Sequence, residues 1–263
     1  MTETERFSFD GDQYSTEPRR IGPLHRLFPS FNFYRQFLWL VSRSSARARR
    51  GEYDGPAWSE SSHRVLHALE SVGVEVAFEG LDHIRGLSSS CVFVGNHMSM
   101  FETIILPAVI QPITNVTFVV KQSLLDYPVF RHILRSRNPI GVSRDNPRED
   151  LKAVLGGGVE RIQDGISIVV FPQTTRSLTF EAENFNTIGV KLAARAGVPI
   201  VPVALITDAW GNGKWIKDLG PITPSKKVHI AFGEPITVSG RGTDEHQQVI
   251  RFIEGKLAEW GRG

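Results

Sequence analysis

The chain has 263 residues, of which 41% are hydrophobic and 22% are charged, and its formal net charge is +2. These values are typical of a globular protein and exclude collagen-like, coiled-coil and wholly disordered chains. Cys91 is the one cysteine. The sequence therefore excludes an intramolecular disulfide and a thiolate zinc site, and a reducing compartment is expected.

Residues 1–18 are polar and acidic and show no hydrophobic periodicity, so we predict that they are disordered. Their acidic side chains differ from the charge pattern of a signal or transit peptide. No run of eighteen apolar residues occurs in the chain. We therefore expect a peripheral rather than an integral membrane protein.

Residues 19–57 are a basic and aromatic arm. Residues 19–50 contain eight arginines and no Asp or Glu, and aromatic side chains lie between the arginines. A helix from an N-cap at Ser30 to Arg43 would be about 20 Å long, which is too short to cross a hydrocarbon core of about 30 Å. The pattern predicts an amphipathic helix that lies on a membrane surface.

Two other interpretations of this arm remain open. Aromatic side chains at helical spacing often pack on a domain core, and such packing is compatible with membrane binding. Arginines with interleaved aromatic residues can also bind nucleic acid, because the rings stack on bases. We rank nucleic acid last and expect no such partner, because it leaves the motifs of the following domain unexplained.

The pattern of residues 58–263 is that of one domain. A helical pattern begins at Ser61 or Ser62 and stops at Gly73, and residues 74–78 alternate as a strand. Further β-rich runs then alternate with helical stretches, at residues 91–94, 116–120, 139–142, 166–171, 200–205 and 228–232. This order predicts an α/β layered fold with a largely parallel or mixed central sheet flanked by helices, and ligand sites at the carboxyl ends of its strands.

A histidine follows the second of these strands. His97 lies in the loop before a helix, five residues before Glu102. Ser99 and Glu102 have the spacing of a capping box, in which the carboxylate reaches back toward the chain entering the helix. From there the carboxylate could also accept a ring proton of His97 and stabilise the imidazolium formed during proton transfer. A helix cap and a catalytic pair predict nearly the same geometry.

Two arginines follow two other predicted strands. Arg144 comes after residues 139–142 and precedes a helix with Asn146 as its N-cap, and Arg176 comes after residues 166–171. A guanidinium binds a phosphate through two parallel hydrogen bonds, so the pair would suit a phosphorylated head group. The alternative for Arg144 is an ion pair with Asp145 or Asp150.

The order and spacing of these segments resemble the lysophospholipid acyltransferases of the glycerolipid pathway, including the 1-acylglycerol-3-phosphate acyltransferases. The resemblance covers roughly residues 75–240 and rests on four ordered motifs. The first motif of the family is similar to Asn96-His97 with the acid at 102. The second is similar to Gly141 through Arg144, which Lys121, Leu124 and Pro128 precede. The third is similar to Phe171 through Ser177, and the fourth to Val198 through Pro202.

The sequence departs from the family pattern at three positions. Glu102 stands where the family usually has Asp, and Gln173 and Thr174 stand where it has Glu and Gly. Gln173 lacks the negative charge, and a β-branched Thr174 poorly tolerates the positive φ that glycine permits. One alternative, a catalytically inactive lipid-binding protein of the membrane surface, would explain Gln173 and Thr174.

The resemblance implies transfer of a fatty acyl group from an acyl-CoA or acyl-carrier-protein thioester to a hydroxyl of lysophosphatidic acid or a related lysophospholipid, in phospholipid biosynthesis. It implies His97 as the general base and Glu102 as the residue that orients it. The substrate-binding residues that it implies are Lys121, Gly141, Arg144, Gln173, Thr175 and Arg176. We expect a membrane phospholipid surface on the cytoplasmic face as partner, with no metal and no cofactor beyond the acyl thioester as co-substrate.

Overall fold

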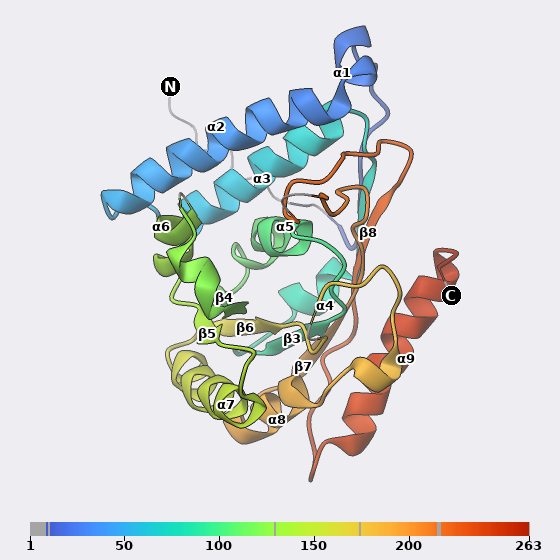
Figure 1. The fold of residues 1–263 in the computed structure, drawn as a ribbon. Coiled ribbons are helices and arrows are strands. Elements are labelled where there is room, and N and C mark those ends of the chain that lie inside the picture. The colour runs from blue at the N-terminus through green and yellow to red at the C-terminus, as the bar shows by residue number, and fades with distance from the viewer. Residues whose placement is uncertain (1–8, 10, 129, 174, 215–216, 263) are drawn as a thin grey trace.

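The computed structural model describes residues 9, 11–128, 130–173, 175–214 and 217–262 (Figure 1). In these residues one eight-stranded sheet has the order β1-β2-β8-β7-β3-β6-β4-β5. The strands are β1 (Tyr14–Ser15), β2 (Val76–Glu79), β3 (Val92–Gly95), β4 (Val116–Lys121), β5 (Ile140–Val142), β6 (Ser167–Val170), β7 (Ile200–Ile206) and β8 (Val228–Phe232).

The sheet is mixed. Strands β3 to β7 all run in one direction, β8 is antiparallel to β7, β2 is parallel to β8, and β1 is antiparallel to β2. The prediction of an α/β fold with a largely parallel or mixed sheet is confirmed. The inner strands are apolar on both faces, as expected of strands that are covered by helices on both sides.

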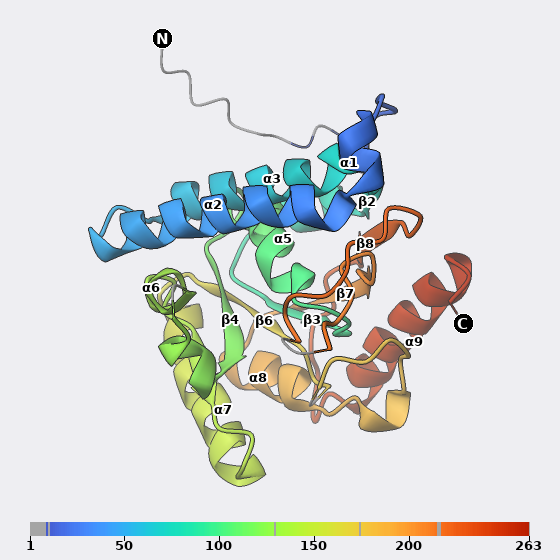
Figure 2. The same cartoon turned by 45° about the horizontal axis from the view of Figure 1, so that its top comes forward.

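Helices cover both faces of the sheet (Figures 1 and 2). Alternate residues of β7 separate the two cores: Val203 packs with residues of α2, α3 and α5, and Ala204 packs with residues of α7, α8 and α9. The helices are α1 (Pro23–Leu27), α2 (Pro29–Arg49), α3 (Gly55–Ser71), α4 (Leu81–Arg85), α5 (Phe101–Ile110), α6 (Phe130–Arg135), α7 (Pro147–Gln163), α8 (Ile188–Ala196) and α9 (Thr243–Glu259), with short 3-10 helices η1 (Gln122–Asp126) and η2 (Ala182–Asn184).

Helix α2 is longer than predicted and packs on the core. Phe33 and Phe37 are 0% and 1% exposed, and their rings lie edge-on against Trp210 at 4.8 and 5.0 Å. The interpretation that the arm packs on the domain core is therefore confirmed. The predicted length was wrong, because 21 residues of helix reach about 30 Å. Among the described helices, none combines the length and the apolar character needed to cross a membrane.

The start of α2 and the start of α3 differ from the sequence prediction. Ser30 does not cap α2, because its hydroxyl instead accepts a hydrogen bond from the amide of Ile222 (2.9 Å). Helix α3 begins at Gly55 and not at Ser61 or Ser62, because the Asp54 carboxylate accepts from the amide of Ala57 (2.9 Å) and Pro56 fits the first turn.

The described part of residues 1–18 is ordered, which differs from the predicted disorder. Tyr14–Ser15 pair with β2, and the side chains of Tyr14, Thr16 and Arg19 donate to the buried carboxylate of Glu70 at 2.6 to 2.7 Å. These hydrogen bonds stabilise the buried negative charge of the carboxylate, and they hold this segment on α3. Residues 1–8 and 10 lie outside the described residues, and the domain boundary between residues 57 and 58 stays a prediction.

Candidate active site

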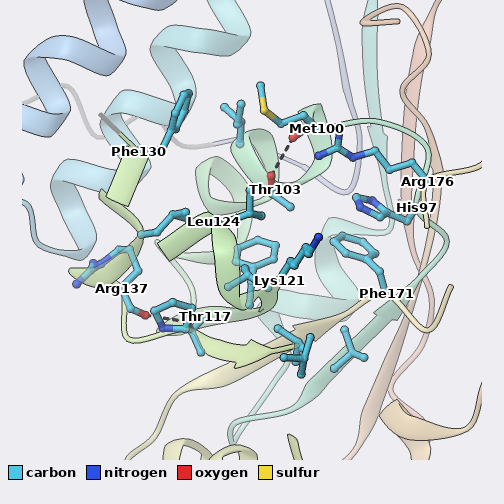
Figure 3. Close-up of a pocket in the computed structure, with 18 of the residues that line it drawn as sticks. His97, Met100, Thr103, Thr117, Lys121, Leu124, Phe130, Arg137, Phe171 and Arg176 are labelled. Atoms are coloured by element: carbon cyan, nitrogen blue, oxygen red, sulfur yellow. Dashed lines mark hydrogen bonds between the residues drawn. The ribbon is translucent and has the colours of Figure 1, made fainter. Parts of the chain in front are cut away.

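Whereas the fourth predicted motif, Val198 through Pro202, lies at the start of β7, the first three meet at the carboxyl ends of the parallel strands β3, β4, β5 and β6. A cavity of about 1170 Å³ opens there (Figure 3). Six of the eight predicted site residues line it: His97, Lys121, Arg144, Gln173, Thr175 and Arg176. The structure therefore brings six of the predicted residues together around one cavity, whereas Glu102 and Gly141 do not line it.

His97 and Glu102 form a buried pair, in which His97 lines the cavity and Glu102 lies behind it. His97 lies in the loop between β3 and α5, and its Nδ1 is 3.1 Å from Oε2 of Glu102. Glu102 is fully buried and His97 is 8% exposed. A carboxylate against Nδ1 holds the proton on that nitrogen, so Nε2, which lies across the ring from Glu102, keeps a lone pair.

The second oxygen of Glu102 accepts three hydrogen bonds. The donors to Oε1 are the amides of Met98 (2.9 Å) and Ser99 (2.8 Å) and the hydroxyl of Thr207 (2.5 Å). The contact with Ser99 is the one that a capping box predicts, and the Ser99 hydroxyl accepts from the amide of Phe101 (3.0 Å) at the start of α5. The carboxylate half of the capping box therefore exists together with the His97 pair. The prediction of Ser99 as N-cap is wrong, because α5 begins after Met100, which makes no side-chain cap.

Three further contacts hold the loop that carries His97. The His97 amide donates to Oε1 of Gln173 (2.7 Å), and its ring stacks on Phe171 at 4.5 Å. The side-chain amide of Asn96 donates to the carbonyl of Leu205 (2.9 Å) and accepts from the amide of that residue (2.8 Å), which extends the pairing of β3 with β7. Sequence reasoning missed this support role of Gln173, because the residue is 76 positions from His97.

Arg144 and Arg176 lie close enough for their charges to interact. Burial lowers the pKa of Arg144, the neighbouring Arg176 lowers it further, and Asp150 raises it. Asp150 accepts from the amides of Ser143 and Arg144 (both 2.8 Å) and so shapes the turn, in which Arg144 has a φ of 68°. The predicted ion pair of Arg144 with Asp150 is therefore not present among the described contacts. The backbone amide of Arg144, and not its guanidinium, binds the Asp150 carboxylate.

Arg176 has a partner that the sequence did not indicate. Its guanidinium donates to Oδ1 of Asp218 (2.6 Å), which also lines the cavity. The carbonyl of Asp218 accepts from the indole of Trp210 (3.2 Å), so a core residue holds this loop. A phosphate that binds Arg176 would have to share it with the Asp218 carboxylate.

The other predicted substrate-binding residues are spread along the same edge. Lys121 is the last residue of β4 and Thr175 follows β6, and both line the cavity. Gly141 lies in β5, where a Cβ would overlap the side chain of Gln122, so its lack of a side chain lets η1 approach the strand. Thr174 lies outside the described residues. The binding roles of these residues stay predictions.

Two hydroxyl or thiol groups near the motif are unsuited to covalent catalysis. Cys91 is fully buried, and burial raises the pKa of its thiol to about 12, against a smaller lowering by the Ser167 hydroxyl. The Ser99 hydroxyl is 2% exposed and donates to Thr207 (3.0 Å). Neither group lines the cavity beside His97. Among the described residues, no group of three metal-ligating side chains comes together.

The cavity extends from His97 between α2, α3, α6 and β4. In Figure 3 His97 and Arg176 lie at one side of the cavity, and Arg137 lies at the other. Aromatic and aliphatic side chains form much of its wall: Phe37, Leu40, Val41, Trp58, Val65, Phe118, Phe130 and Ile133. The volume exceeds the 300–1,000 Å³ of typical small-molecule pockets and this part of the wall is apolar, so the cavity suits a long hydrocarbon chain.

Known proteins with a similar sequence are acyltransferases. A 1-acyl-sn-glycerol-3-phosphate acyltransferase of Pseudomonas aeruginosa is 29% identical over 192 residues, which are 71% of this chain and 70% of that protein. The enzyme of the same name from Haemophilus influenzae is 27% identical over 183 residues, which are 65% of this chain and 70% of that protein.

A solved structure shares the fold. The crystal structure of the 1-acyl-sn-glycerophosphate (LPA) acyltransferase PlsC from Thermotoga maritima matches with a TM-score of 0.70 at 19% identity, covering 91% of this chain and 98% of that chain. The Acyltransferase family model matches residues 75–206, which begin before β2 and reach the end of β7. Because this match includes the His97 motif and spans half of the chain, the protein belongs to the acyltransferase family.

Proposed function

We propose that the protein transfers a fatty acyl group from an acyl-CoA or acyl-carrier-protein thioester to the hydroxyl of lysophosphatidic acid or a related lysophospholipid. The reaction would serve phospholipid biosynthesis at the cytoplasmic face of a membrane. The observation that carries the proposal is the buried His97–Glu102 pair at the wall of a long, largely apolar cavity. Product formation from a labelled acyl thioester and lysophosphatidic acid tests it, and no product with either thioester would contradict it.

The geometry supports direct transfer with His97 as the general base. Nε2 would accept the proton of the acceptor hydroxyl while its oxygen bonds to the thioester carbonyl carbon. The C–S bond then breaks, and the imidazolium returns the proton to the departing thiolate. Glu102, which accepts from Nδ1, stabilises the imidazolium. A positioned base of this kind contributes roughly 10²- to 10⁴-fold to the rate.

Charge in the cavity favours phosphorylated substrates. The cationic side chains among the described lining residues outnumber the carboxylates of Asp150 and Asp218. They are Lys121, Arg137, Arg144, Arg176, Lys191 and Lys217. Both proposed substrates carry phosphate groups, and guanidinium groups bind phosphate with matched hydrogen bonds.

Gln173→Glu is expected to change the ratio of kcat/KM between acceptors, and so their ranking, by about tenfold. This is the effect of one added charge in a partly buried site. A glutamate could accept the same hydrogen bond from His97, so the loop should be retained while a negative charge is added near Arg144 and Arg176. The measurement is kcat/KM for lysophosphatidic acid and for acceptors with other head groups, with one donor, and then for a series of donors.

Gln163→Glu is the control, because Gln163 is an exposed residue at the end of α7 and the variant adds a charge far from the cavity. If Gln173→Glu altered the preference for acyl length and left the acceptor ranking unchanged, Gln173 would lie near the acyl chain and not near the head group.

We propose that an exposed apolar patch, formed by α1, α2 and the residue between them, binds the membrane surface. The patch consists of Leu24, Leu27, Phe28, Phe31, Leu38 and Trp39, each at least half exposed. Exposed arginines of the same helices, Arg26, Arg35 and Arg43, alternate with it along the chain, and Arg43 lies over the Trp39 ring at 5.5 Å. Another side of α2 forms part of the cavity wall through Phe37 and Leu40. Binding of the patch to a membrane would bring the cavity close to its lipid substrates.

Replacing Phe31, Leu38 and Trp39 together with serine is expected to weaken binding to anionic vesicles by at least about tenfold, because each exposed side chain loses apolar area. Vesicle co-sedimentation measures it. High salt should weaken wild-type binding only in part, since screening acts on the arginines and not on the apolar contacts. Substitution is preferable to deletion of residues 19–50, because Phe33 and Phe37 belong to the core.

Ile113→Ser is the matched control, since Ile113 is an exposed apolar residue between α5 and β4, outside the patch. Unchanged sedimentation of the triple variant would show that the patch does not bind the membrane.

A further inference from the structure

Thr207 lies directly after β7 and is fully buried. Its hydroxyl donates to Oε1 of Glu102 (2.5 Å) and accepts from the hydroxyl of Ser99 (3.0 Å), which in turn accepts from the amide of Phe101 (3.0 Å). The direction of this chain is fixed. Because an ionised carboxylate can only accept, Thr207 gives its one proton to Glu102, and Ser99 must therefore give its proton to Thr207.

Thr207 differs in one respect from the other two donors to Oε1. The amides of Met98 and Ser99 belong to the same turn as His97, so they move with it. Thr207 belongs to the segment that follows β7, in the middle of the sheet. Its hydroxyl therefore fixes the orientation of the carboxylate relative to the sheet.

We propose that Thr207 is a positioning residue for acyl transfer. By holding Oε1 it keeps Oε2 on Nδ1 of His97, which keeps the ring proton on Nδ1 and the Nε2 lone pair available to the acceptor hydroxyl. The proposal rests on the proposed function. It adds to the site a residue that lies outside the four sequence motifs.

The kinetic test compares Thr207→Val with Thr207→Ser. Valine keeps the shape and removes the hydroxyl, while Oε1 retains two amide donors, so the protein should fold. We expect Thr207→Val to lower kcat about tenfold with KM changed by less than about twofold, because the carboxylate acts on the proton-transfer step. Serine restores the hydroxyl and should return kcat to within about threefold of wild type.

A double-mutant cycle separates positioning from general stability. In the Glu102→Gln background, Thr207→Val should change kcat by less than about twofold, because no carboxylate remains to be oriented. Ser167→Ala removes another fully buried hydroxyl, one that binds the amide of Cys91, and should leave kcat unchanged. An equal loss from Thr207→Val in both backgrounds would overturn the proposal.

A spectroscopic readout does not depend on turnover. Imidazole ¹H–¹⁵N spectra, assigned with His97→Ala, should show the His97 proton on Nδ1 in wild type and Thr207→Ser, and a mixture of tautomers or a lost Nδ1–H signal in Thr207→Val. Wild-type spectra from Thr207→Val would overturn the proposal. A chain that shows these spectra but transfers no acyl group would refute the proposed function, while the positioning of the His97 ring by Thr207 would stand.

Discussion

The His97→Ala variant is expected to lose roughly 10²- to 10⁴-fold in kcat for acyl transfer, the contribution of a positioned general base. The alanine removes Nε2, the atom that would accept the proton of the acceptor hydroxyl. KM for both substrates should change little, because the cationic side chains that would bind phosphate remain. Steady-state kinetics with a labelled acyl thioester and lysophosphatidic acid measure the loss.

The variant should remain folded, since His97 lies at a cavity wall and its loop is held by contacts of the backbone amide and of Asn96. His132→Ala is the matched control, because His132 on α6 does not line the cavity. A folded His97→Ala protein with near wild-type turnover would show that another group is the base.

Glu102→Gln is expected to produce a loss that approaches that of His97→Ala. The three donors to Oε1 require an oxygen at that position, so the amide of glutamine must turn its NH₂ toward His97. An NH₂ can only donate, so Nδ1 would become an acceptor and the ring proton would move to Nε2. That is the wrong tautomer for a base, and the same change in serine-protease triads costs about 10⁴-fold.

Glu102→Asp is the control that separates the charge of the side chain from its length. Aspartate is one methylene shorter, but it keeps the negative charge and is the usual acid of the family's first motif. We therefore expect this variant to retain more activity than the glutamine variant. If the glutamine variant were as active as the aspartate variant, the tautomer of His97 would not depend on Glu102.

Local patterns predicted much of the fold. The bounds of β8 coincide with the predicted residues 228–232, and Asn146 caps α7 through the amides of Arg148 and Glu149 as its position before Pro147 indicated. These features depend on residues that are close in the sequence. The start of α3 was missed although Asp54 and Pro56 are signals for it, because the neighbouring glycines favoured a turn.

The candidate site was predictable only in part, for a physical reason. His97 and Glu102 are five residues apart, so the spacing of the motif contains their contact. Thr207 and Gln173 reach the same turn from 105 and 76 residues away, and Asp218 reaches Arg176 from 42 residues away. The packing of the sheet brings these residues together, and no local pattern of the chain indicates it.

Direct transfer with His97 as base is tested most directly by a rapid-quench experiment with the full chain, a radiolabelled acyl thioester and anionic vesicles, with and without lysophosphatidic acid. The account predicts that without acceptor no acyl group becomes bound to the protein. With acceptor, phosphatidic acid should form at the rate at which thioester disappears, and His97→Ala should slow both by roughly 10²- to 10⁴-fold. An acyl-protein adduct that forms without acceptor and passes its acyl group to lysophosphatidic acid would contradict it.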